Sequence, residues 1–286
     1  MRLTASTTLA LVAFAGNSIL CRIALRHATI DAATFSTIRL ASGAATLLLV
    51  TVWTQRRVSH AKGSWPSACM LFLYAVPFSF AYISLSTGTG ALILFGSVQV
   101  TMMIGALRSG ERPHPLQWFG LGLALAGLVY LVLPGIAAPP LSGAALMALA
   151  GFSWGVYSLR GRGAANPIAQ TTSNFVRSVP LVLAVSLIAL PRFHAEPTGV
   201  VLAVASGTFA SGLGYVVWYV ALPGLTATRA AVVQLAVPIL ATAGGVIFLA
   251  ESVSVRLVLS TAIVLGGVAP AILCRERLAL GADHSV

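Results

Sequence analysis

The sequence predicts an all-α polytopic membrane protein whose ten transmembrane helices form two inverted five-helix repeats. Of its 286 residues, 58% are hydrophobic and only 8% are charged, and the mean hydropathy is +0.94. This composition leaves too little polar surface to cover a water-soluble core, so lipid must solvate most of the exterior. The chain also divides into ten apolar runs, each close to the ~20 residues that a helix needs to cross the ~30 Å hydrocarbon layer. A third observation, an internal duplication, defines the two halves.

Five apolar runs occupy the first half of the chain. Most are separated by joints with basic residues, but the joint between Ser86 and Thr89 has none. Pro77 interrupts the third run, which membrane helices tolerate where neighbouring groups satisfy the freed backbone carbonyls. Glycines in the fifth run permit close approach of another helix. The predicted spans are residues 4–24, 32–53, 65–86, 89–107 and 116–133.

The second half repeats this organisation. Pro180 and Pro238 interrupt two of its runs, and Gly266 and Gly267 lie in its last run. Because small residues allow helices to approach closely, we expect the fifth run of each half to be a packing helix at the periphery of the bundle. The predicted spans are residues 141–159, 167–190, 198–219, 229–249 and 256–273.

The two halves align with each other at three separate places. Glu111 and Glu251 each follow a long apolar run, "FSTIRLASG" aligns with "SNFVRSVPL" so that Arg39 matches Arg177, and "YISL" aligns with "YVAL". Because each half has an odd number of spans, the second half enters the membrane from the opposite side. Such inverted repeats are typical of carriers that alternate around a midplane site. The predicted units are a first repeat at 1–137, a second, inverted repeat at 138–275, and a cytoplasmic tail at 276–286.

Basic residues are unevenly distributed between the joints. The joints on the side of the N-terminus hold eleven Lys and Arg, whereas those on the other side hold four. Since basic residues favour the cytoplasmic face, we expect both termini in the cytoplasm and a multi-pass location in a bacterial-type inner (plasma) membrane. This topology explains the net charge of +11. We therefore expect the protein to interact with the lipid bilayer and not with nucleic acid.

Sequence motifs for catalysis and metal binding do not have the required context. "GFSWG", residues 151–155, matches the G-x-S-x-G pattern of a nucleophilic serine, but Ser153 falls in an apolar helix and all five His fall in predicted joints or tails. That pattern needs a strand-to-helix turn and a His base. The three Cys lie far apart in no metal spacing. We therefore expect that the protein is not an enzyme and that it has no cofactor and no metal site.

The last two spans of each half share a pattern around the glutamate. The second half reads "VPILATAGGVIFLAESVSVRLVLSTAIVLGGV" and the first reads "VQVTMMIGALRSGERPHPLQWFGLGLALAGLVYLVLPG". This pattern resembles the EamA family of the drug/metabolite transporter superfamily, and the resemblance covers nearly the whole length. The first half departs from it with Val98 and Gln99 where the second has Pro238. That departure, together with "SLSTGTGALILFGSVQV", resembles the YddG-type branch, known as exporters of aromatic amino acids.

Polar and aromatic residues within the spans predict a substrate site. In lipid, such groups tend to face a bundle interior or a wet cavity. Tyr215 and Trp218 share one helix face, and Tyr74, Phe78 and Tyr82 form another stripe. The alternative for an aromatic stripe is plain packing, but the resemblance implies that these spans surround a central cavity. The predicted substrate-binding residues are Asn17, Tyr82, Gln99, Trp154, Tyr157, Tyr215, Trp218 and Gln234.

Two arginines lie deep within predicted spans. We expect Arg39 and Arg177 to extend toward the membrane interface, because a long side chain can bury its stem and keep its charge in water. The alternative is that one of them holds a substrate carboxylate in its guanidinium fork.

The two glutamates at the ends of spans also have two interpretations. Glu111 has arginines beside it, and Glu251 has Arg256 one turn on. We expect each Glu to pair with its neighbouring base or to cap the helix that follows. The alternative is a gate contact that breaks during transport.

The sequence therefore predicts a secondary transporter that exports small amphipathic metabolites by alternating access. A cavity of rings and a few amides suits a substrate with an aromatic body and a polar end, so aromatic or other hydrophobic, neutral amino acids are the expected substrates. Alternatives are drugs or other metabolites on the same fold, or a membrane-embedded enzyme or receptor. No Asp, Glu or His lies away from the span ends, so we expect no obligatory proton coupling. We expect the chain to function as a monomer.

Overall fold

The computed structural model describes residues 2–55, 63–108, 115–135, 138–161, 165–221 and 233–267. These residues form helices, joined by short turns and one isolated antiparallel bridge between Ile30 and Ala195. Several predicted features lie outside the described residues: Glu111, the beginning of the predicted span 229–249, the end of the predicted span 256–273, and the C-terminal tail.

The first half of the chain forms five helices in the predicted ranges. Ser64 accepts a hydrogen bond from the backbone N–H of Ser67 and so caps the third helix, whose next residues include Pro66. A side-chain oxygen at this position satisfies an N–H that has no partner within the helix. The helices are α1 (Arg2–Arg26), α2 (Ala32–Gln55), α3 (Trp65–Ala81), α4 (Thr87–Arg108) and α5 (Pro115–Val132).

The second half follows the same order with one irregular helix. Asn166 caps the N-terminus of its second helix at the backbone N–H of Ala169. Its third helix is continuous from Pro197 to Ala221 but adopts π-helical hydrogen bonding over the middle segment. The elements are α6 (Leu141–Gly161), α7 (Pro167–Ile188), the short η1 (Leu190–Arg192), α8 (Pro197–Ala205), the π-helix η2 (Ser206–Leu213), α9 (Gly214–Ala221), α11 (Ala236–Leu249) and a last helix over Val255–Gly267.

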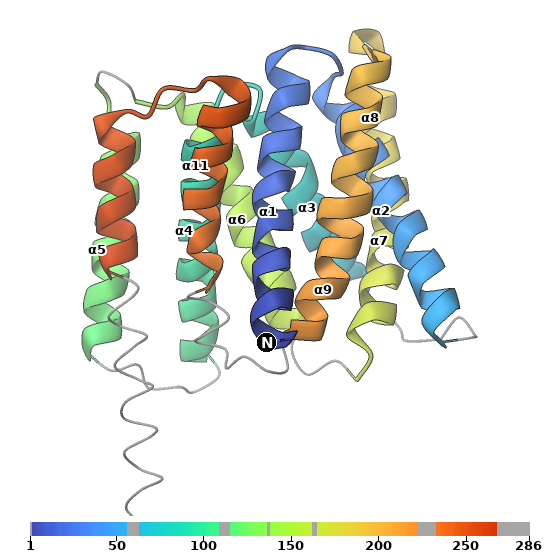
Figure 1. The fold of residues 1–286 in the computed structure, drawn as a ribbon, viewed down its shortest axis with the longest axis horizontal. Helices are drawn as coiled ribbons and strands as arrows, with labels where there is room; N and C mark the ends of the chain where they lie inside the picture. The colour runs from blue at the N-terminus through green and yellow to red at the C-terminus, as the bar shows by residue number, and fades with distance from the viewer. Residues whose placement is uncertain are drawn as a thin grey trace, which may run out of the picture.

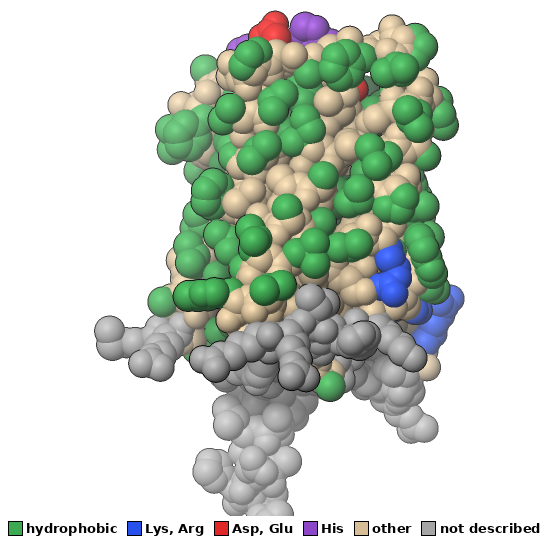
Figure 2. Space-filling view, turned by 90° about the vertical axis from the view of Figure 1, so that its right-hand side faces the viewer, with side chains coloured by type: hydrophobic (Ala, Val, Ile, Leu, Met, Phe, Trp, Pro, Cys, Tyr) green, Lys and Arg blue, Asp and Glu red, His purple; other side chains and the backbone are tan. Residues whose placement is uncertain are grey.

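Among the described residues, six helices are long and apolar enough to cross a membrane, and four more are shorter apolar helices. Large hydrophobic side chains such as Leu49, Phe119, Val201 and Ile247 lie exposed on the outside of the bundle, and Figure 2 shows hydrophobic side chains spread over the visible face. An apolar exterior of this kind has to be solvated by lipid. The chain is therefore a multi-pass membrane protein.

The predicted span 65–86 extends too far. Helix α3 ends at Ala81, and residues 82–86 form a turn before α4 begins at Thr87. Arg22 of α1 donates hydrogen bonds to the carbonyl oxygens of Tyr82 and Ile83 at 2.8 and 3.0 Å. These carbonyls are left without helical partners where α3 stops, so a distant arginine replaces the helical hydrogen bonds that the sequence pattern suggested.

Helix α5 and the last helix lie together at one edge of the bundle (Figure 1). A Cβ atom at Gly267 would lie 2.7 Å from the carbonyl oxygen of Gly120, and one at Gly127 would lie 2.8 Å from Val264. The prediction that glycines in the fifth run of each half permit close approach of another helix is confirmed at Gly127 and Gly267. It is wrong for Gly122 and Gly266, where an added Cβ would meet nothing within 4 Å.

The π-helix η2 packs closely against α2. A Cβ at Gly207 would overlap the side-chain oxygen of Ser42 and the backbone oxygen of Arg39, and a Cβ at Gly212 would lie 3.1 Å from Thr46. Glycine is needed here because the backbones of two helices meet with no room for a side chain. π-helical turns inside α-helices often mark functional sites, and this one faces the centre of the bundle.

We expect Gly207→Ala to lower the free energy of unfolding by about 1–3 kcal/mol, because the added methyl group overpacks the contact with α2. Thermal unfolding of the protein in detergent measures the effect. Gly122→Ala in α5 is the matched control, and we expect it to be neutral or slightly stabilising, since Ala favours a helix over Gly by roughly 1 kcal/mol. Equal melting temperatures for the two variants would contradict the close packing of α2 and η2.

Candidate functional site

A small cavity lies in the centre of the bundle, where helices from both halves meet. Its free space for the centre of a water molecule is about 10 Å³, which holds roughly one water. The structure is therefore closed around the cavity. The lining residues come from α1, α3, α4, α6, η2 and α9, and they are Phe14, Asn17, Ser18, Tyr74, Phe78, Leu94, Phe95, Trp154, Ala210 and Tyr215.

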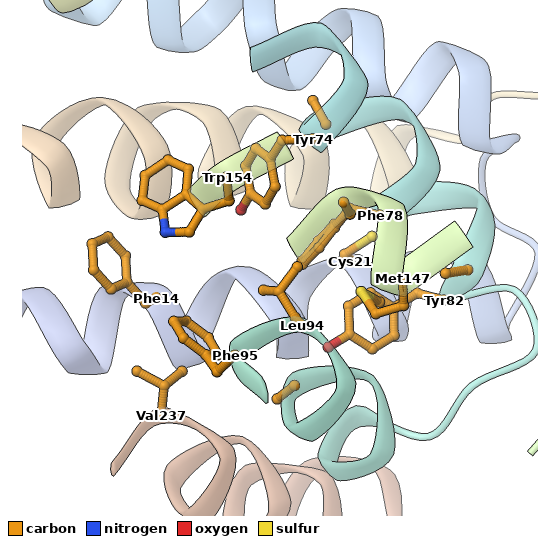
Figure 3. Close-up of a cluster of buried hydrophobic side chains, with 14 of the residues drawn as sticks. Phe14, Cys21, Tyr74, Phe78, Tyr82, Leu94, Phe95, Met147, Trp154 and Val237 are labelled. Carbon is orange, nitrogen blue, oxygen red and sulfur yellow. The ribbon is translucent and has the colours of Figure 1, made fainter. Parts of the chain in front are cut away.

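Aromatic rings form most of the cavity wall. The ring of Trp154 lies 5.0 Å from the centroids of both Tyr74 and Tyr215, and 6.1 Å from that of Phe14. Figure 3 shows Phe14, Tyr74 and Trp154 turned toward one another, with Phe95 beside them. Such tilted and edge-to-face pairs are the preferred contacts between aromatic rings. The rings of Phe14, Tyr74, Trp154 and Tyr215 come from four different helices, so a movement of those helices would separate the rings.

A short chain of hydrogen bonds crosses the wall of the cavity. The side-chain amide of Asn17 donates to the hydroxyl of Tyr74 at 3.1 Å, and its carbonyl oxygen accepts from Ser206 at 2.6 Å. The three residues belong to α1, α3 and η2. Buried polar groups need such partners in an apolar interior, so Asn17 links the two halves of the chain at the level of the cavity.

Arg39 does not extend to the membrane interface, so that prediction is wrong. Only 1% of its surface is exposed. Its Nη2 donates to the Tyr74 hydroxyl at 2.9 Å and its Nε donates to Ser211 at 3.2 Å, while the guanidinium carbon lies 4.8 Å from the centroid of Phe78. Gly207 of η2 lies against the backbone of Arg39, and the guanidinium is held between α3 and η2 by Tyr74 and Ser211.

Arg177, which the alignment of the halves pairs with Arg39, has a different environment. It is half-buried, and its Nη1 donates to the side chain and the backbone oxygen of Ser173 on its own helix. The two arginines are therefore not equivalent in this conformation, and only Arg39 lies against the cavity wall.

Three of the predicted substrate-binding residues line the cavity. They are Asn17, Trp154 and Tyr215. Two more lie directly behind it: Tyr157 stacks on Trp154 at 5.7 Å, and Trp218 packs against Phe14 at 5.7 Å.

The other three predicted residues are buried elsewhere. Tyr82 packs against Phe78 at 4.8 Å and donates its hydroxyl proton to the backbone oxygen of Thr87, so it joins the end of α3 to the start of α4. Gln99 and Gln234 are buried but are not among the cavity-lining residues.

Several lining residues of the cavity were not predicted from the sequence. Tyr74 and Phe78 belong to a recognised stripe from which only Tyr82 was selected, and Phe14 lies three residues before Asn17, on the same helix face. The signal that could have identified Phe14 is therefore its position three residues before the polar residue Asn17 in the same helix. Leu94 and Ala210 carry no such signal, because nothing distinguishes them from lipid-facing or packing residues.

Glu251 lies at the end of the bundle where α3 joins α4. Its Oε1 lies 3.1 Å from Nε of Arg22, and its Oε2 accepts a hydrogen bond from the backbone N–H of Thr87 at 2.8 Å. Glu251 therefore caps α4, a helix of the other half, and does not cap the helix that follows it. This position is favourable because the N-terminus of a helix attracts negative charge.

Arg256 is not the partner of Glu251, which corrects the prediction. Its Nη1 donates to the backbone oxygens of Leu131 and Leu133, and its guanidinium lies 5.7 Å from the centroid of Tyr130. Arg256 thus satisfies carbonyls at the C-terminus of α5, where a positive charge is favourable.

The described residues show no group of three or more His, Cys, Asp or Glu that could hold a metal ion. Ser153 lies within α6, fully buried, and not at a strand-to-helix turn. The "GFSWG" match is therefore a segment of a membrane helix.

Comparisons with known proteins point to one family. The sequence profile of the EamA-like transporter family matches residues 5–133 and again residues 141–273. An uncharacterized protein of Pseudomonas aeruginosa is 48% identical over 263 residues, which is 92% of each chain. An uncharacterized transporter of Archaeoglobus fulgidus is 27% identical over 81% of this chain and 83% of its own. A crystal structure with a TM-score of 0.66 and 18% identity covers 93% of this chain and 98% of its own, and supports the fold.

We expect Glu251→Ala to lower the free energy of unfolding by about 1–3 kcal/mol, because it leaves Arg22 and the Thr87 N–H without their acceptor. The two side chains are only 13% and 11% exposed, so water replaces these contacts poorly. Glu196→Ala is the matched control: Glu196 also precedes a helix, but its side chain is 54% exposed and makes no capping hydrogen bond. Equal melting temperatures for Glu251→Ala and Glu196→Ala would show that the contact of Glu251 with Arg22 and α4 contributes little to stability.

Proposed function

The chain belongs to the EamA-like transporter family, and from this premise we propose that it is a secondary transporter of small amphipathic metabolites. Aromatic or other neutral amino acids are the proposed substrates, and export by alternating access is the proposed mechanism. The family assignment itself makes the chain a membrane transporter; substrate, direction and mechanism belong to the proposal.

The cavity is the observation that carries the proposal. It lies among helices of both halves, and its wall combines the rings of Phe14, Tyr74, Trp154 and Tyr215 with the amide of Asn17. Sites for small molecules are mostly apolar, with a few placed polar groups that fix orientation. This lining matches a solute with an aromatic body and one polar end, and a single chain encloses it, which supports function as a monomer.

The packing of the helices supports an inverted repeat. The family profile matches the chain twice, once in each half. Helix α2 packs against α7 and α4 against α11, which pairs the corresponding helices of the halves, and α3 packs on α6 just as α8 and α9 pack on α1. This reciprocal pattern is what two related halves facing each other produce, and inverted repeats of this kind support alternating access.

The closed cavity represents an intermediate state of the proposed cycle. Its space for about one water (10 Å³) is far below the roughly 300–1,000 Å³ of a ligand pocket. Substrate entry therefore requires the rings around Trp154 to separate. At one end of the bundle Arg22 and Glu251 connect α1, α4 and the segment after α11, so opening toward that end has to break this ion pair.

The charge distribution supports the proposed orientation in the membrane. Acidic and histidine side chains gather at one end of the visible face, whereas Lys and Arg lie toward the other (Figure 2). Asp31, His194 and Glu196 belong to the joints at the first end. By the positive-inside rule that end faces away from the cytoplasm, and both termini are proposed to lie in the cytoplasm of a bacterial-type cell.

We expect counterflow of labelled phenylalanine in proteoliposomes with the same pH on both sides, because the proposed mechanism needs no proton. Trp154→Ala should reduce this flux by about tenfold or more, since Trp154 contacts the other rings of the cavity and a buried aromatic side chain contributes about 1.5–3 kcal/mol. Uptake that occurs only with an imposed pH gradient would contradict transport without proton coupling.

Trp53→Ala is the control for Trp154→Ala. Trp53 lies near the end of α2 with 88% of its surface exposed, so we expect unchanged flux. Membrane insertion and melting temperature are measured for both variants. Flux that falls equally in both variants, or in neither, would contradict a role for the cavity.

A further inference from the structure

A cluster of polar side chains lies in and directly behind the aromatic wall of the cavity. Tyr74 and Tyr215 line the cavity. The guanidinium of Arg39 lies over the ring of Tyr74, 5.1 Å from its centroid, and bonds to Ser211, one helical turn before Tyr215. Arg39 is therefore separated from the cavity only by the rings that line it.

The charge of Arg39 has no counter-charge in the described part of the chain. Its partners are the neutral side chains of Tyr74 and Ser211, and its Nη1 is buried without a hydrogen-bond partner among the described residues. The carboxylates of Glu196 and Glu251 pair with other residues, and that of Asp31 accepts hydrogen bonds from the backbone N–H groups of Thr34 and His194. A buried charge without a counter-ion is strongly unfavourable, so the closed cavity is electrostatically incomplete.

Two hydroxyl groups beside this charge are available as donors. The oxygen of Tyr74 accepts from Arg39 at 2.9 Å and from Asn17 at 3.1 Å. Both of its lone pairs are then used, which leaves its own O–H to donate. The hydroxyl of Tyr215 is buried with no partner among the described residues. The wall of the cavity thus offers two O–H donors next to a positive charge.

We infer that the cavity recognises its substrate through a carboxylate group, which accepts hydrogen bonds from Tyr74 and Tyr215 and balances the charge of Arg39. A carboxylate is an acceptor with two oxygens and a negative charge, which is the complement of this cluster, and the aromatic wall then holds the apolar body. The inference rests on the proposed transport function and narrows its substrates to aromatic or apolar carboxylates. Arg39 acts here as a positioning residue: it orients the hydroxyl of Tyr74 through their hydrogen bond, and its positive charge attracts the carboxylate.

Ligand binding to the purified protein tests this inference without any transport step. The probes are phenylalanine, 3-phenylpropanoate, phenylalaninamide and phenethylamine, and the readout is the rise in melting temperature with ligand concentration. We expect the two carboxylates to bind about 10- to 100-fold more tightly than the amide and the amine, because hydrogen bonds to a charged group account for such a factor.

Substitutions at Tyr215 and Arg39 test which groups produce the preference for carboxylates. Tyr215→Phe removes a hydroxyl that has no partner, so we expect it to fold normally and to lose about tenfold of the preference for carboxylates. Arg39→Gln should abolish the preference, and Arg39→Lys should restore part of it because the charge is retained. Arg177→Gln, the change at the corresponding arginine of the other half, is the matched control and should leave the preference unchanged.

Equal binding of 3-phenylpropanoate and phenylalaninamide by the unmodified protein would overturn the inference, even if the Arg39 variants do not fold. An unchanged preference in both Tyr215→Phe and Arg39→Gln would overturn it as well. A carboxylate preference in binding combined with no counterflow of any probe would instead contradict the proposed transport function and leave the recognition of carboxylates standing.

Discussion

A full positive charge held away from water is the constraint on which the centre of this structure depends. Arg39 is buried on α2, and an apolar interior tolerates such a charge only if the surrounding groups are arranged to meet it. Tyr74 of α3 and Ser211 of η2 bond to the guanidinium, and Asn17 of α1 bonds to Tyr74 in turn. Gly207 lets η2 lie against the backbone of Arg39 itself. Four segments from both halves are thus positioned around one side chain, and the aromatic cavity lies beside it.

A second partly buried arginine, Arg22, lies at one end of the bundle, but its charge is neutralised by a carboxylate. There Arg22 does have a carboxylate partner, Glu251, which also caps α4 at Thr87. The pair is complete and polar, close to the membrane surface, whereas the charge at Arg39 is incomplete and central. A carrier needs contacts that close its ends and can break, and a central site that is completed only when the substrate is bound. In the proposed transport cycle, the pair of Arg22 and Glu251 is the contact that closes one end, and the cluster around Arg39 is the central site.

Much of the fold could be predicted from the sequence, because lipid imposes a strong pattern of apolar length and basic joints. Helices occupy the described part of each predicted range. The end of α3 was not predicted, since Arg22, sixty residues away from Tyr82, replaces its helical hydrogen bonds. Tyr215 was predicted from a stripe at helical spacing, and Asn17 and Trp154 were predicted as polar or aromatic residues within apolar spans; all three line the cavity. The depth of Arg39 and the partner of Glu251 could not be predicted, because both depend on which helices become neighbours in space, and sequence periodicity describes only one helix at a time.

The central claim is that the cavity beside Arg39 opens alternately to the two sides of the membrane. The most direct measurement is the labelling of a single cysteine at Ala210, a buried lining residue, after replacement of Cys21, Cys69 and Cys274. Membrane-impermeant thiol reagents are applied separately to each face of oriented membranes, with and without phenylalanine. The account predicts labelling from both faces, slowed by phenylalanine in each case. Labelling from neither face, or from one face only under all conditions, would contradict it.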